Sequence, residues 1–134
     1  MNFGIIVSDF NSDITGAMLQ GAVKGFEEQG YSVDIVHVPG AVEIPVALQH
    51  YIQSRRPQAV VTLGCVIKGD TEHYEAVCRM CADGIMRVML DTKIPVVFEV
   101  LMVDALEKAR VRIEKGYEAA FTAVRMAQIV KTVS

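Results

Sequence analysis

The chain has 134 residues, which is the size of one domain and leaves no room for a second. Hydrophobic residues make up 51% of it and only four prolines occur, so disordered and collagen-like chains are excluded. The net charge is −3 and the basic residues are scattered, which gives no basic surface for nucleic acid. We therefore expect a single globular domain over residues 1–134.

The apolar segment Phe3–Asp9 is too short to span a membrane and has no basic lead or cleavage site beside it. We expect a cytoplasmic protein that binds no membrane. Three cysteines, an odd number, argue against a disulfide framework. Cys78 and Cys81 form a C-x-x-C within an expected helix, where we interpret them as buried apolar residues and not as metal ligands. The mean hydropathy of +0.31 favours apolar contacts between copies of the chain.

Short apolar runs rich in β-branched residues alternate with segments of helical spacing. The runs predict strands at Phe3–Val7, Val33–Val38, Ala59–Leu63 and Pro95–Val100. The expected apolar helix faces are Ile14, Met18, Ala22 and Phe26; Ile44, Leu48 and Ile52; and Val77, Met80, Gly84 and Val88. Two more helices are expected at about Val103–Arg112 and Tyr117–Val130, with Gly30 and Gly116 marking breaks.

This alternation predicts an α/β protein with a parallel four-stranded sheet between two helical layers, a three-layer α/β/α sandwich. Ligands of such sheets bind beyond the carboxyl ends of the strands. The residues that follow each expected strand are therefore the candidates for function.

After the first strand, Asn11 or Ser12 can cap the next helix, and Phe10 is left at the rim. Phe10 can pack on that helix or offer a face on which a flat heterocycle stacks. After the second strand, a Pro-Gly turn leads to Glu43 in the first turn of a helix. The Glu43 carboxylate can complement the helix dipole or accept hydrogen bonds from a polyhydroxy chain.

The stretch after the third strand is the most informative. Gly64 and Gly69 allow tight turns, and Asp70 and Thr71 open the next helix, so free backbone N–H groups make an anion site. The stretch lacks the Lys-Ser/Thr ending of a nucleotide-binding P-loop. His73 falls in the first helical turn, where the helix dipole and a bound anion poise an imidazole as a proton carrier.

Two more histidines, His37 and His50, have no comparable setting in the sequence. Phe98 ends the fourth strand, and Arg112 and Lys115 lie near the last junction between helices. Two cations three residues apart are typical of a solvated face, yet a neighbouring copy of the chain could bring them to an anion.

The ordered motifs of the chain together resemble the lumazine synthase family over almost the whole sequence. The motifs are Phe10-Asn11, Pro39-Gly40-Ala41-Val42-Glu43-Ile44-Pro45, Gly64-Cys65-Val66-Ile67-Lys68-Gly69-Asp70-Thr71-Glu72-His73 and Pro95-Val96-Val97-Phe98. The resemblance implies a flavodoxin-like subunit in five-fold rings, which in many members pack into icosahedral shells. It also implies an active site between adjacent subunits.

The resemblance also implies roles for single residues. Phe10 would stack on the pyrimidine, while contacts to the ring and its ribityl chain would come from Ala41, Val42, Glu43, Cys65, Val66 and Ile67. The phosphate would be held by Gly69, Asp70 and Thr71, and the neighbouring subunit would add Phe98, Arg112 and Lys115. His73 would be the acid and base.

The implied reaction joins 5-amino-6-(D-ribitylamino)uracil to 3,4-dihydroxy-2-butanone 4-phosphate with loss of phosphate and water. It needs no metal or organic cofactor, because juxtaposition of the reactants and exclusion of water supply much of the rate. The chain departs from the family at Glu99, where glycine is usual, at Met102-Val103, usually Thr-Thr, and in a shortened segment from Arg112 to Gly116. It also starts at its first strand.

Three other functions compete with this one. An archaeal-type riboflavin synthase has a related fold but lacks the Glu-Ile-Pro and Asp-Thr-x-His pieces. A non-catalytic shell or flavin-binding protein would be expected to lose His73 or Arg112, and both are present. A generic flavodoxin-like module would need a hydroxyl-rich phosphate loop after its first strand, where Asp9-Phe10-Asn11 stands instead.

Overall fold

The computed structural model describes residues 1–69 and 72–134. Its strands are β1 (Phe3–Ser8), β2 (Val33–Val38), β3 (Ala59–Ile67) and β4 (Val96–Val103). Its helices are α1 (Ser12–Glu28), the 3₁₀ turn η1 (Ala41–Glu43), α2 (Ile44–Arg55), α3 (His73–Thr92), α4 (Leu106–Arg110) and α5 (Lys115–Val133). None of these helices is long and apolar enough to cross a membrane.

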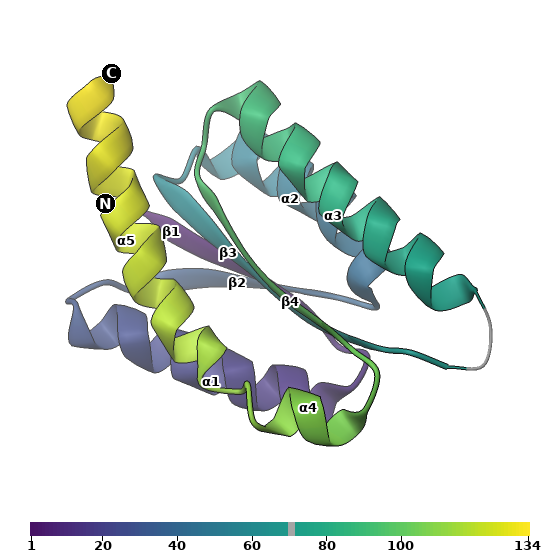
Figure 1. Ribbon diagram of the computed structural model, residues 1–134. Helices are drawn as coiled ribbons and strands as arrows, with labels where there is room; N and C mark the ends of the chain where they lie inside the picture. Colours follow the sequence, from purple (N-terminus) through teal and green to yellow (C-terminus); the bar gives the residue numbers. More distant parts are fainter. Residues whose placement is uncertain (70–71) are drawn as a thin grey trace.

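The strands form one parallel sheet in the order β2-β1-β3-β4. Figure 1 shows α1, α4 and α5 on one side of this sheet and α2 and α3 on the other. The expected three-layer α/β/α sandwich with four parallel strands is therefore confirmed.

Each face of the sheet has its own apolar core, because alternate residues of a strand point to opposite faces. In β1, for example, Phe3, Ile5 and Val7 are buried beneath α1 and α5, whereas Ile6 is buried beneath α2. The strands carry Val, Ile and Leu at consecutive positions, as is typical of parallel sheets covered on both sides. The two cores hold the strands so that all their carboxyl ends meet at one edge.

Glycines let α1 and α5 pack closely. A Cβ atom at Gly116 would lie 2.2 Å from the Met18 carbonyl oxygen, and one at Gly25 would lie 2.8 Å from the Ala120 Cβ. Gly116 is thus a contact residue within α5, and the expectation that it marks a break was wrong. The break at Gly30 is confirmed, since this residue has φ +87 just after α1.

The last two strands are longer than the sequence predicts. β3 continues to Ile67 and pairs with β4 as far as Val103, so the stretch from Gly64 is strand at first and not loop. Packing favours a glycine at position 64, since a Cβ there would lie 3.1 Å from Val100 Cγ1 and 3.2 Å from Ser8 Oγ. The helix expected from Val103 is only the five-residue α4.

The buried face of α3 differs from the predicted one at Met80, whereas Val77, Gly84 and Val88 lie on it as expected. Cys81, Ile85 and Val88 are buried, whereas Met80 is 57% exposed. Burial raises the pKa of the Cys81 thiol to about 12 and also raises the pKa of Cys78. Both thiols therefore stay protonated near neutral pH, which supports their interpretation as apolar residues.

Candidate functional site

The segment between β1 and α1 presents Phe10 at the carboxyl edge of the sheet. The Phe10 side chain is 70% exposed, so it does not pack on α1 as a staple would. Backbone amides hold the segment against the end of β2: Asp9 N donates to Val38 O at 2.8 Å, and Phe10 N donates to Pro39 O at 3.1 Å. Phe10 is thus an exposed aromatic ring on an anchored backbone.

Asn11 anchors the same segment to β3. Its side-chain amide donates to the Cys65 carbonyl at 2.8 Å, and its backbone is left-handed, with φ 61. From the sequence we expected Asn11 or Ser12 to cap α1 with its side chain. In the structure neither side chain does so. Asparagine adopts the left-handed conformation more readily than most residues, and its amide reaches a carbonyl that lies beyond the end of β1.

His37 and Asp9 form a side-chain contact next to Phe10 that the sequence did not reveal. His37 Nδ1 lies 2.8 Å from Asp9 Oδ1, and both side chains are more than half exposed. The two residues are 28 positions apart and meet because β1 and β2 are parallel neighbours, with Val7 opposite His37. Only the pairing of strands could have predicted this contact.

The turn after β2 forms the next part of the edge. Ala41 is buried, Val42 is half-buried and Glu43 is exposed, and all three belong to η1. Glu43 is the residue just before α2, and its Oε1 lies 3.1 Å from where a Cβ of Gly40 would stand. The glycine therefore leaves room for the Glu43 carboxylate to fold back over the turn.

The end of β3 lies beside this turn. Cys65 is 2% exposed, and Val66 and Ile67 are half-buried. Burial, followed by the charge of Asp13, raises the pKa of the Cys65 thiol, so this thiol is a neutral packing group and no nucleophile. The end of β3 thus supplies apolar surface and backbone groups to the edge.

The loop from β3 to α3 is the segment in which the sequence predicts an anion site. Gly69 is exposed, with no atom within 4 Å of a Cβ placed on it, while Asp70 and Thr71 lie outside the described residues. Lys68 ties the start of the loop to both neighbouring elements. Its N–H donates to Val103 O at 2.9 Å, and its ammonium lies 3.6 Å from Glu75 of α3.

His73 lies in the first turn of α3, as predicted, and is the residue at which the helix begins; its side chain is exposed. It lines an open hollow of about 530 Å³ together with Glu72, Glu75, Ala76 and Arg79. Residues at the start of a helix lie beside backbone N–H groups that have no partner within the helix. The imidazole is thus accessible at the end of the edge where an anion would bind.

Phe98, Arg112 and Lys115 are not brought to this edge by their own chain. Phe98 pairs with Thr62 in the middle of β3 and is not the last residue of its strand, so the prediction that it ends β4 was wrong. It lies ~10 Å along the strand from Leu101, which pairs with Cys65. Its ring is 39% exposed.

Arg112 and Lys115 lie on the α1 side of the sheet, opposite the helix that carries His73. An Arg112 guanidinium nitrogen donates to the Lys108 carbonyl at 2.7 Å, and the Lys115 ammonium lies 3.6 Å from Glu118. Figure 1 shows α4 and the start of α5 separated from α3 by the sheet. Within one chain, Arg112 and Lys115 therefore contact residues of their own helical layer, on the opposite face of the sheet from α3.

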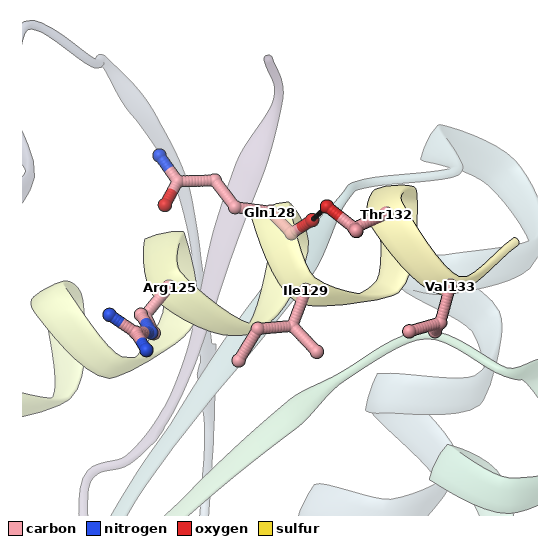
Figure 2. A pocket seen from close by; sticks show the side chains of 5 residues that line it. All are labelled: Arg125, Gln128, Ile129, Thr132 and Val133. Carbon is pink, nitrogen blue, oxygen red and sulfur yellow. Dashed lines mark hydrogen bonds between the residues drawn. The ribbon is translucent and has the colours of Figure 1, made fainter.

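A separate hollow lies on the outer side of α5, shown in Figure 2. It is lined by Arg125, Gln128, Ile129, Thr132 and Val133. In this hollow, Thr132 Oγ1 donates to the Gln128 carbonyl at 3.0 Å, as helix-facing threonines commonly do. Because a single helix supplies the lining, this hollow has no convergence of elements comparable to that at the sheet edge.

Comparison with known proteins agrees with the motifs at the edge. The profile of the 6,7-dimethyl-8-ribityllumazine synthase family matches residues 1–131. A protein of that name from Thermococcus gammatolerans is 38% identical, over 98% of this chain and 88% of its own length. Proteins of that name from two strains of Xanthomonas oryzae pv. oryzae are 40% identical, over 96% of this chain and 89% of theirs. The chain therefore belongs to the 6,7-dimethyl-8-ribityllumazine synthase family, whose members are enzymes of riboflavin biosynthesis.

Proposed function

We propose that the chain condenses 5-amino-6-(D-ribitylamino)uracil with 3,4-dihydroxy-2-butanone 4-phosphate and releases 6,7-dimethyl-8-ribityllumazine, phosphate and water. The observation that carries the proposal is the convergence of the family's motif residues at one sheet edge. An exposed ring at Phe10, a carboxylate at Glu43 and an imidazole at His73 come from three different connections. Together they offer groups for a flat heterocycle, a polyhydroxy chain and a proton.

The pyrimidine would bind between Phe10 and the end of β3. The exposed Phe10 ring can stack on the heterocycle, because aromatic rings gain from offset stacking as well as from burial. The backbone of Cys65, Val66 and Ile67 can pair with its polar edge, and the Glu43 carboxylate can accept hydrogen bonds from the ribityl hydroxyls. Ala41 and Val42 would line the passage between these groups.

The phosphate of the second substrate would bind at Gly69, Asp70 and Thr71, beside the start of α3. Backbone N–H groups at a helix start bind anions well. The cations for the same phosphate would be Arg112 and Lys115 of a neighbouring copy, which would also bring Phe98. The helices next to Arg112 and Lys115, α4 and α5, lie on the opposite face of the sheet from α3, which supports this shared arrangement.

His73 would carry protons between the reacting atoms. Imine formation, loss of phosphate, ring closure and loss of water each require a proton to be moved, and histidine does this efficiently near neutral pH. The rest of the rate would come from holding two reactants together away from water, so the reaction needs no cofactor. The working form would be a cytoplasmic five-fold ring, alone or within a 60-subunit shell.

The test is to mix the purified chain with both substrates and follow the fluorescence of the lumazine product. His73→Ala should lower kcat about 10²-fold, since a positioned proton carrier contributes about that much. Arg112→Ala should mainly raise the KM of the phospho-sugar. His50→Ala, which removes an exposed histidine of α2, is the matched control and should leave both constants unchanged.

Two results would count against the proposal. Unchanged kinetics in both the His73 and the Arg112 variants would contradict the roles proposed for these two residues. Formation of riboflavin from lumazine alone, without the two precursors, would contradict the proposed reaction, because this would assign the chain to the riboflavin synthase reaction.

A further inference from the structure

We propose that His37 and Asp9 are positioning residues that hold Phe10 in the orientation in which it stacks on the pyrimidine. The inference rests on the proposed function, because it takes Phe10 as the stacking residue. Neither side chain needs to touch the substrate. Asp9 would act through the backbone that it shares with Phe10, and His37 would act through Asp9.

The geometry at the ends of β1 and β2 supports this role. His37 is the second-last residue of β2, an edge strand, and Asp9 is the first residue after β1. The 2.8 Å contact joins His37 Nδ1 to Asp9 Oδ1, a distance that a hydrogen bond from imidazole to carboxylate has. The bond thus crosses from the edge strand to the residue that precedes Phe10.

The contact completes a set of anchors around an aromatic ring that has little packing of its own. Asp9 N and Phe10 N donate to carbonyls at the end of β2, and the Asn11 amide donates to the Cys65 carbonyl of β3. Without His37, the exposed Asp9 side chain would rotate in solvent. Fixing it removes backbone and side-chain freedom that substrate binding would have to remove.

The surroundings of this contact favour a positioning role over a structural one. Both side chains are more than half exposed, and an exposed contact between polar side chains contributes little to the stability of a fold. Asp34, two residues before His37, serves the other face of the sheet by accepting a hydrogen bond from Tyr51 at 2.9 Å. The contact of His37 with Asp9 thus joins β2 to the residue just before Phe10 on the face of the sheet that Asp34 does not serve.

The experiment measures the binding of 6,7-dimethyl-8-ribityllumazine by its fluorescence, together with kcat and the two KM values, in the full-length protein. His37→Ala and Asp9→Ala should each weaken lumazine binding and raise the pyrimidine KM about two- to fivefold, the effect of one exposed charged hydrogen bond. The phospho-sugar KM and kcat should not change. His37→Asn should restore wild-type binding, because its side-chain amide can still donate to Asp9.

Two double variants separate positioning from a general loss of structure. Asp9→Ala with His37→Ala should bind lumazine as each single variant does, because the two residues act as one unit. Phe10→Ala should weaken binding about tenfold by loss of stacking, and adding His37→Ala to it should cause no further loss.

The outcomes distinguish the inference from the proposed function. If Phe10→Ala binds lumazine as the wild type does, the stacking role in the proposed function fails. If Phe10→Ala weakens binding but His37→Ala and Asp9→Ala do not, the positioning role alone is overturned. A further loss when His37→Ala is added to Phe10→Ala would also overturn it, because His37 would then act on the ligand by another route.

Discussion

The two helical layers of the molecule are built differently. In the layer of α1 and α5, glycine and alanine lie in the contact, and Gly116 meets the backbone of Met18 directly. In the layer of α2 and α3, larger side chains remain on the outside, with Met80 57% exposed and Leu90 66% exposed. The first layer therefore brings two helix backbones together directly, whereas in the second the closest contact at a glycine is with the side chain of Pro45.

This difference shows what the stripes of small residues in α1 and α5 do. From sequence, these small faces can serve contacts within one subunit or between subunits. They consist of Gly16, Ala17, Gly21, Ala22 and Gly25 in α1 and of Ala119, Ala120, Ala123 and Ala127 in α5. In the structure, Gly21 and Gly25 face Tyr117 and Ala120 of the same chain. The small stripes serve the subunit core, and surface for other copies must be sought elsewhere, including on α3.

The largest effect on stability is expected at the contact of α1 with α5. Gly116→Ala places a Cβ 2.2 Å from a backbone oxygen, which cannot move aside as a flexible side chain can. We expect a loss of about 3 kcal/mol in the free energy of unfolding, the upper range for overpacking. Denaturant unfolding measures this loss.

Gly16→Ala in α1 is the matched control for this variant. A Cβ at Gly16 has no atom within 4 Å among the described residues. This substitution should stabilise the protein by about 0.5–1 kcal/mol, because glycine within a helix costs conformational entropy. Equal effects at Gly16 and Gly116 would refute the close approach of the two helices.

The second layer should tolerate an added methyl group better. Gly84→Ala brings a Cβ to 2.6 Å from Pro45 Cγ, which is a side-chain atom on α2 and not backbone. We expect a loss of about 1–2 kcal/mol, smaller than at Gly116, because α2 and α3 can separate slightly. A loss larger than that of Gly116→Ala would reverse the order of rigidity that we assign to the two layers.

Glu99, a residue of β4, should make the stability of the protein depend on pH. Burial raises its pKa above the ordinary value of 4.5, Lys115 partly offsets this, and Glu118 adds to it. Because the folded state binds this proton more tightly than the unfolded state, the contribution of Glu99 to stability is fully present below pH 4.5 and is lost as the pH rises through the raised pKa.

Glu99→Gln should therefore raise the Tm more at pH 7 than at pH 3.5. The glutamine keeps the shape of the side chain but carries no charge to be desolvated. Thermal unfolding at both pH values checks this. An equal change in Tm at the two pH values would mean that Glu99 is no worse solvated in the folded protein than in the unfolded one.

The smallest effect is expected on the outer side of α3. Leu90→Gln replaces a side chain that is 66% exposed, and it should change the free energy of unfolding of a subunit by no more than about 0.5 kcal/mol. Val88→Gln, two residues earlier at a buried position, should cost several times more. Similar losses in both variants would show that Leu90 is covered.

The sequence predicted the three layers and the order of strands and helices along the chain, because hydrophobic periodicity and β-branched runs report burial directly. It underestimated the lengths of β3 and β4. Gly64 was interpreted as a turn residue, but it lies within β3, where the side chains of Val100 and Ser8 leave no room for a larger residue. Periodicity cannot tell a glycine required by conformation from one required by packing.

The candidate site was predictable where its residues follow strands directly. Phe10 and His73 lie where the motifs predicted, at the edge of the sheet and at the start of α3. The pairing of His37 with Asp9 and the bond from Asn11 to Cys65 depend on the register of neighbouring strands. Contacts of this kind join residues far apart in the chain, so a pattern within one segment cannot reveal them.

The central claim is that each active site takes His73 from one copy and Arg112 from the next. Coexpression of His73→Ala chains with Arg112→Ala chains tests it, because a ring of mixed subunits would rebuild some sites with both residues intact. At equal mixing, about a quarter of the sites should be complete and activity should rise well above that of either variant alone. A mixture no more active than the average of its two parents would contradict the claim.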